Sequence, residues 1–205
     1  MAGHPNETSP LGLRNIGFAL QVGGQDSAYN RNKIARDWKT KLADLKKADP
    51  KGYEHFVKVH EGKGHWMNLE DAIAVPWMAR LQRNRFPERV VWKQDDVTHE
   101  RFYWLQLPES KRKGRPEVVA ERDGQTIRIV KSDVDELTIL LNDEMLKLDR
   151  PVKVIQGDRV LFEGKVPRTL GAIVRTTIDR GDPGMVFSAS VQVEPEATKK
   201  ADEAG

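Results

Sequence analysis

The feature that most constrains the fold is a regular alternation of apolar patterns in the first 60 residues. Residues 16–22 (IGFALQV) form a nearly continuous apolar run, which is typical of a strand covered on both faces. Residues 31–48 follow with helical periodicity, and residues 53–60 (YEHFVKVH) predict a second strand. The helical stripe consists of Ile34, Trp38, Leu42 and Leu45. Because a helix joins two strands, the sequence predicts a parallel pair with a right-handed crossover.

A further helix is expected after the loop that follows the second strand. Asn68 is a suitable N-cap for it, and Ile73, Trp77 and Leu81 share one apolar face. Pro76 lies inside this pattern, so the sequence predicts a kink or a split there.

The pattern changes at about residue 88, where short segments rich in β-branched and aromatic residues begin. Asp123-Gly124 and Gly157-Asp158 each predict a hairpin turn, and residues 168–181 predict one helix among the strands. The apolar positions of that helix are Leu170, Ile173, Val174 and Ile178. Seven or so short strands favour a β-sandwich. We therefore expect domains at 1–87 and 88–194, and a disordered polar tail at 195–205.

Composition narrows the classes of partner. Hydrophobic residues make up 38% and charged residues 32%, so a core is possible beneath a heavily charged surface. The 34 Lys and Arg against 31 Asp and Glu lie in mixed-sign runs, which predicts no nucleic-acid partner. No apolar run is long enough to cross a membrane, and no cysteine is present for thiol chemistry. The first residues do not resemble a signal peptide, and the compartment stays open.

Asp26 and His65 are the candidate catalytic residues. Asp26 follows the first strand and His65 follows the second, so both are expected at the carboxyl edge of the sheet. An aspartate there can fix the tautomer of a histidine and leave its other nitrogen to accept a proton. Gly62 and Gly64 would let the loop fold back towards Asp26. The alternative is that Asp26 caps a turn and His65 is an ordinary loop residue.

The contexts "GGQD" around Asp26 and "GKGHW" around His65 resemble the carboxyl-terminal part of bacterial α/β-hydrolases. The most similar members are dienelactone-hydrolase and prolyl-oligopeptidase-like esterases and peptidases. The resemblance covers roughly the first 85 residues, and the β-rich remainder resembles an extension that some of these enzymes carry. It implies that Asp26 is the acid and His65 the base of a Ser-His-Asp triad.

The chain departs from that family at the nucleophile. The G-x-S-x-G elbow is absent, and none of the serines has the flanking glycines that such an elbow needs. The serines of the chain are Ser9, Ser27, Ser110, Ser132, Ser188 and Ser190. Three explanations of the missing elbow remain open. Met1 could be an internal residue of a longer parent protein, the chain could be a catalytic relic, or a partner subunit could supply the nucleophile. We expect the chain to be inactive by that route as it stands.

Three other groups carry weaker chemical signals. His55 and His60 lie near His65 in sequence. Because these histidines are distributed over a strand and a loop and no cysteine is present, they make a poor zinc site, and no metal is predicted. Asp95, Asp96 and His99 could bind a cation, although a turn whose acids satisfy backbone amides fits better. The basic segment KRKGR (111–115) is expected to be a solvated loop.

Together these inferences predict a fold of class α/β plus β. It would be the C-terminal part of an α/β-hydrolase parallel sheet, followed by a β-sandwich-like domain. The predicted function is hydrolysis of a small ester or peptide in the parent protein, without a cofactor. The alternative is a non-catalytic interaction protein that binds through the β-sandwich. A two-stranded sheet leaves apolar surface uncovered, so self-association or a missing N-terminal half is expected.

Overall fold

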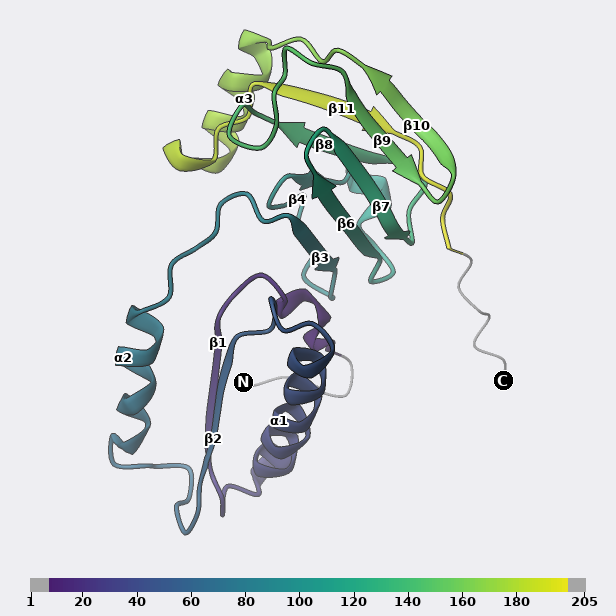
Figure 1. Cartoon of the computed structure of the whole chain (residues 1–205). Helices are drawn as coiled ribbons and strands as arrows, with labels where there is room; N and C mark the ends of the chain where they lie inside the picture. The colour runs from purple at the N-terminus through teal and green to yellow at the C-terminus, as the bar shows by residue number, and fades with distance from the viewer. Residues whose placement is uncertain (1–7, 199–205) are drawn as a thin grey trace. The chain divides into compact units, whose positions relative to one another are not determined.

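The computed structural model describes residues 8–198 and divides the chain into two compact units, Met1–Asn84 and Arg85–Gly205. We call these the N-terminal unit and the C-terminal unit. Figure 1 shows the helices and strands of each. In the N-terminal unit these are η1 (Pro10–Leu13), β1 (Phe18–Gly23), η2 (Ala28–Asn30), α1 (Arg31–Ala48), β2 (His55–His60), η3 (Glu70–Ile73) and α2 (Ala74–Ala79).

The N-terminal unit contains a two-stranded parallel sheet with a helix on each face (Figure 1). β1 and β2 pair in register from Phe18 opposite His55 to Gly23 opposite His60. Phe18 contacts Trp38 of α1, with ring centroids 5.5 Å apart. On the opposite face, Phe56 contacts Trp77 of α2 at 5.7 Å. The predicted parallel pair and its helical crossover are therefore present.

Helix α1 has the bounds that its apolar periodicity predicts. Trp38 and Leu42 are buried on its inner side and pack with Tyr53 in a small core cluster. The helix ends at Ala48, because Asp49 precedes Pro50 and leaves helical geometry.

The segment after the His65 loop differs from its predicted helix. It splits between Ile73 and Ala74 into η3 and α2, and Pro76 lies in the first turn of α2, where a missing N–H does no harm. Asn68 is not the cap, since it has a left-handed backbone with φ 52°. Leu69 occupies the position before η3 without a capping side chain.

The C-terminal unit consists mainly of strands. They are β3 (Arg89–Lys93), β4 (Arg101–Phe102), β5 (Leu105–Gln106), β6 (Glu117–Asp123), β7 (Thr126–Ser132), β8 (Leu137–Leu141), β9 (Val152–Gln156), β10 (Arg159–Gly164) and β11 (Ala189–Val193). The helical segments are η4 (Glu109–Lys111), α3 (Leu170–Arg180) and η5 (Pro183–Met185). One sheet has the strand order β10-β9-β7-β6-β3, and the other has the order β11-β8-β5-β4.

Both sheets contribute to one hydrophobic core. Val118, Ile127 and Val154 from the five-stranded sheet belong to the same buried cluster as Leu105 and Ile139 from the four-stranded sheet. The larger side chains Trp104 and Phe187 are fully buried in it. Alternating burial along β11 follows from the period-two geometry of a strand with one inner face.

The two predicted hairpin turns are present. β6 and β7 are antiparallel and meet at Gly124, and β9 and β10 meet at Gly157. These glycines have φ values of 54° and 56°, which favour glycine over residues with a side chain.

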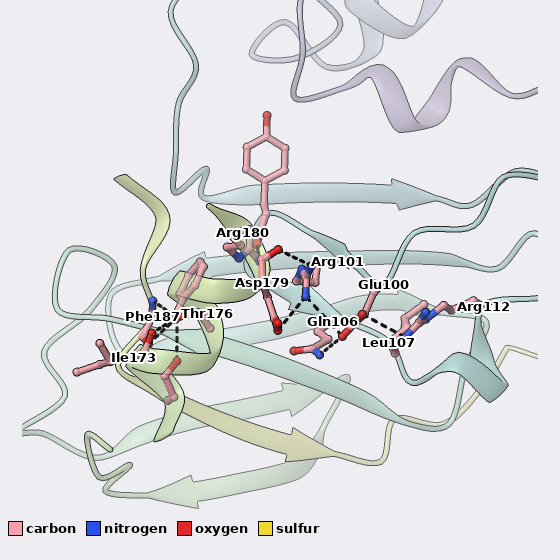
Figure 2. A network of polar contacts seen from close by, with 12 residues as sticks. Glu100, Arg101, Gln106, Leu107, Arg112, Ile173, Thr176, Asp179, Arg180 and Phe187 are labelled. Carbon is pink, nitrogen blue, oxygen red and sulfur yellow. Dashed lines mark hydrogen bonds and ion pairs between the residues drawn. The ribbon is translucent and has the colours of Figure 1, made fainter. Parts of the chain in front are cut away.

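Helix α3 is held by polar contacts on its inner side, as Figure 2 shows. The buried hydroxyl of Thr176 accepts a hydrogen bond from Phe187 N at 3.0 Å and lies 2.8 Å from Ala172 O. Arg180 donates to Tyr103 O at 2.6 Å, and Arg101 pairs with Asp179 at 3.0 Å. The apolar positions of the helix are exposed instead, namely Leu170, Ile173, Val174 and Ile178.

The predicted fold class is wrong. Over residues 8–198 the molecule is mostly β-sheet with few helices, and the two-stranded β1–β2 sheet is the one wholly parallel sheet there. The sheet with five strands is mixed, and the sheet with four is antiparallel. The error arose because the fold class was taken from the resemblance of two loop sequences to α/β-hydrolases, whereas the two strands before those loops pair with each other in a two-stranded sheet.

The end of the described chain is attached to the C-terminal unit. Glu196 N donates to Gln156 Oε1 at 2.6 Å, and Thr198 N donates to Ser132 O at 2.7 Å. The rest of the expected disordered tail, 199–205, lies outside the described residues. Across the part of the chain that is described, no helix is long and apolar enough to span a bilayer.

Candidate active site

Two loops at the carboxyl ends of β1 and β2 carry the candidate residues. The first loop turns at Asp26, whose N–H donates to Gly23 O at 3.0 Å. The second loop follows His60 and reaches His65. Backbone hydrogen bonds join the loops, from Gly24 N to His60 O at 2.8 Å and from Gln25 N to Lys63 O at 2.8 Å. The two loops therefore form one hydrogen-bonded structure at this edge of the sheet.

Gly23 and Gly24 permit the close approach of these loops. A Cβ at Gly23 would lie 1.9 Å from Gly64 O and 2.5 Å from Lys63 O. A Cβ at Gly24 would lie 2.5 Å from a carboxylate oxygen of Glu61. Since the first two neighbours are backbone atoms, a side chain at Gly23 would force the loops apart.

Asp26 and His65 meet across the loops. Oδ2 of Asp26 is 2.9 Å from Nδ1 of His65. The other carboxylate oxygen, Oδ1, accepts a hydrogen bond from Arg31 Nη1 at 3.2 Å. Each oxygen of the buried carboxylate thus has its own cationic or N–H partner, which fixes its orientation.

These contacts determine the protonation state of Asp26. The hydrogen bond with His65, and secondarily the contacts with Arg31, hold the pKa of the Asp26 carboxyl below its usual value, while burial opposes them. Asp26 is therefore ionised at neutral pH and can only accept hydrogen bonds. Consequently Nδ1 of His65 carries a proton, and in the neutral imidazole Nε2 has the free lone pair.

The second nitrogen of His65 is available to a reactant. The His65 side chain is 68% exposed, against 6% for Asp26. Among the described residues Nε2 has no hydrogen-bond partner. Trp66 lies beside the ring with centroids 6.4 Å apart and is itself 85% exposed.

Four of the seven non-glycine residues with positive φ in the described chain lie on the same two loops, and the other three are Tyr53, Tyr103 and Arg115. Tyr29 and Asn30 have φ values of 52° and 56°, and Asn68 and Leu69 have values of 52° and 63°. Such conformations are unfavourable for residues with a side chain and cluster at functional sites. The guanidinium carbon of Arg31 lies 5.0 Å from the centroid of the Tyr29 ring. Tyr29 therefore contacts the arginine that donates a hydrogen bond to Asp26.

Within residues 8–84, the other two histidines are hydrogen-bonded inside the unit. His55 Nδ1 lies 2.8 Å from Tyr53 O, and His60 Nε2 lies 2.8 Å from Gln21 Oε1. Over residues 8–198, no three His, Cys, Asp or Glu side chains are placed to hold a metal ion.

The candidate cation site at Asp95, Asp96 and His99 is a turn closed by an arginine. Arg115 donates to Asp96 at 2.7 Å and lies 3.5 Å from Asp95. Gln94 closes the turn, because its side chain donates to His99 O and accepts from His99 N. A guanidinium therefore occupies the place that a cation would take.

The basic segment 111–115 is likewise paired with acids. Lys111 lies 2.6 Å from Asp135, and Arg112 lies 3.6 Å from Glu100.

Sequence reasoning missed two contributors to the site. Arg31 was assigned to the helix without a role, although its position five residues after Asp26 places it at the start of α1, beside the turn. Gly23 and Gly24, the two glycines of the GGQD segment, had no role assigned, and the structure shows that they permit the contact with the opposite loop. A pair of glycines at a strand end is a general signal of close backbone approach.

Comparison with known proteins adds no relative: no family model, curated protein or solved structure matches the chain. The catalytic roles of Asp26 and His65 and the resemblance to hydrolases stay predictions.

Proposed function

We propose that Asp26 and His65 are the acid and base of a serine hydrolase whose nucleophile lies outside residues 1–205. The observation that carries the proposal is the 2.9 Å contact between Asp26 Oδ2 and His65 Nδ1, with Nε2 turned to solvent. Asp26 would orient the imidazole and stabilise its protonated form. His65 would remove the proton of a serine hydroxyl and then return it to the leaving group.

The substrate class proposed is a small ester or a peptide, cleaved through an acyl-enzyme. A buried, ionised carboxylate paired with an exposed imidazole supports proton transfer at neutral pH. The serine sequences of this chain do not support an internal nucleophile, because none has the glycine neighbours of a strained elbow. The nucleophile is therefore assigned to a further segment of a parent protein or to a partner chain.

Exposed apolar side chains support a covering segment over the N-terminal unit. Those near the two loops are Tyr29, Trp66 and Leu69, and those along η3 and α2 are Ile73, Val75 and Met78. We propose that they are covered in the working protein, by the segment with the nucleophile or by a second copy of the chain. A monodisperse monomer over a wide concentration range, without binding of a hydrophobic dye, would contradict this part.

Fluorophosphonate labelling tests the hydrolase proposal, because the probe reacts with a serine that a histidine activates. The purified chain is expected to take up no label above background. Stoichiometric labelling of one of its own serines would overturn the assignment of the nucleophile to another segment.

The nucleotide sequence upstream of Met1 decides which protein is tested next. If an in-frame G-x-S-x-G segment is present, the longer protein that contains it is expressed and tested. If it is absent, this chain is used as bait to purify its complex from native cells, and that complex is tested. His65→Ala and Asp26→Asn should reduce labelling rates by on the order of 10³-fold or more. His55→Ala and Asp37→Asn are matched controls in the same unit and should label normally. Equal labelling in His65→Ala and the wild type would refute the proposal.

A further inference from the structure

The loop that carries His65 is closed at its base by a buried polar network. The loop comprises residues 61–69, between the end of β2 and the start of η3. His60, the last residue of β2, is only 4% exposed, and Gln21 of β1 lies next to it. The network is separate from the Asp26–His65 contact.

The orientation of each polar group in the network follows from its partners. Gln21 donates its side-chain N–H to Asp71 O, which leaves its oxygen, Oε1, to face His60. Oε1 can only accept, so His60 Nε2 carries a proton and donates to it over 2.8 Å. One glutamine side chain thus connects β2 to η3, the two elements that bound the loop.

A second connection crosses the loop. Glu70 of η3 pairs with Lys63 at 2.6 Å, and its other oxygen lies 3.8 Å from His60 Nδ1. The hydrogen bond with Lys63 holds the pKa of the Glu70 carboxyl below its usual value, so this carboxyl is ionised at neutral pH. Lys63 also accepts the hydrogen bond from Gln25 N, one residue before Asp26.

His60 therefore holds both ends of the loop that carries His65. The backbone carbonyl of His60 accepts from Gly24 N and Lys63 N, at 2.8 and 3.2 Å. Its side chain fixes the far end of the loop through Gln21. His65 has a single side-chain hydrogen bond and is exposed, so its position depends on the base of the loop.

We propose that His60 and Gln21, supported by the Glu70–Lys63 pair, are positioning residues that hold His65 Nδ1 against Asp26. The proposal rests on the proposed function, since it assigns these residues to the same site. It gives a role to a buried histidine that takes no part in proton transfer.

The test follows the Asp26–His65 contact in the purified chain by NMR. The titration midpoint of the Asp26 carboxyl reports the contact, because the hydrogen bond with His65 is the largest cause of its low pKa. The ¹⁵N shifts of the His65 ring report the tautomer that Asp26 imposes. Amide exchange of Gly24 and Gln25 reports the hydrogen bonds between the loops.

His60→Leu and Gln21→Leu should raise the Asp26 midpoint towards that of His65→Ala. They should also mix the tautomers of His65 and accelerate exchange of the Gly24 and Gln25 amides by about fivefold or more. His55→Leu, on the same strand but outside the network, should leave all three unchanged. Comparison at pH values where each variant is folded by circular dichroism separates these effects from a general loss of stability.

Glu70→Gln covers the case in which the buried variants do not fold, because Glu70 is about half exposed. It removes the charge opposite Lys63 and should give the same changes with smaller amplitude. An unmoved Asp26 midpoint and an unmoved His65 tautomer in the folded variants would overturn the proposal.

The hydrolase proposal fails separately. An extended protein or complex that takes no fluorophosphonate would overturn the function and leave the NMR result for the loop intact.

Discussion

The two units differ in how completely they bury their apolar side chains. The C-terminal unit encloses a large cluster between two sheets, with Trp104, Phe187 and Ile127 fully buried. The buried cluster of the N-terminal unit consists of Trp38, Leu42 and Tyr53, with partly buried neighbours around it. The unit that carries the candidate site is therefore the one with the smaller core. The comparison shows that the candidate site lies on the part of the molecule with fewer buried apolar side chains, where backbone hydrogen bonds join the two loops.

Core truncation should give the largest effects and the clearest contrast. Trp104→Ala is expected to lower the free energy of unfolding of the C-terminal unit by about 3–5 kcal/mol, because it empties a closed site and removes the hydrogen bond to Pro87 O. Leu42→Ala should lower that of the N-terminal unit by about 2 kcal/mol, since half-exposed neighbours can relax into the space. Urea unfolding followed by NMR signals of each unit measures both. A larger loss for Leu42→Ala would reverse the comparison.

The contact between the two loops should also be sensitive to substitution. Gly23→Ala is expected to lower the free energy of unfolding by about 1–3 kcal/mol, because its Cβ would meet backbone oxygens of the opposite loop. Gly64→Ala is the matched control, because a Cβ there has open space and should change stability by about 0.5 kcal/mol or less. Denaturant midpoints measure both, and the Asp26 titration should respond to Gly23→Ala alone. Equal effects of the two substitutions would refute the role assigned to Gly23.

Exchanges between Thr and Val, which have similar shapes, compare the inner and outer sides of helix α3. Thr176→Val leaves Phe187 N–H without its acceptor and should reduce stability by about 1–3 kcal/mol. Val174→Thr adds a hydroxyl at an exposed position and should change stability by about 0.5 kcal/mol or less. Thermal unfolding of the two variants decides this, and a neutral Thr176→Val would mean that the polar contacts do not hold the helix.

The smallest effect expected is the pH dependence that Asp26 contributes. Because its pKa in the folded protein is below the unfolded value of 3.8, its contribution is fully present above that value and is lost as the pH falls through the folded pKa. The N-terminal unit should therefore lose stability below about pH 4 more steeply in the wild type than in Asp26→Asn. Urea midpoints at several acidic pH values measure the slope, and parallel slopes would contradict the assignment.

Local structure was predictable wherever one residue pattern decides it. The spacing of Ile34, Trp38 and Leu42 predicted α1, and Gly124 and Gly157 predicted their hairpins. The meeting of Asp26 and His65 was predictable because parallel neighbouring strands end at the same edge.

Features set by distant contacts were not predictable. The apolar stripe of α3 predicted the helix but not which side faces inwards. The hydrogen bonds of Thr176 with Phe187 place Thr176 inside, and Val174 and Ile178 are exposed. How the later strands pair into one mixed and one antiparallel sheet depends on contacts across the whole chain, which no local pattern encodes. The fold class was wrong because it was taken from the resemblance to α/β-hydrolases.

The parallel pairing of β7 with β9 has a consequence for how the C-terminal unit folds. Thr126 lies opposite Lys153, although β8, which separates the strands along the chain, belongs to the other sheet. The hairpins β6–β7 and β9–β10 have short turns, and such hairpins form in about 1–10 μs. To join the two hairpins, the intervening chain must cross to the opposite sheet and close a long loop. The entropy of that loop is lost before the β7–β9 hydrogen bonds can compensate for it. The contacts between β7 and β9 are therefore expected to form after the two hairpins that they join.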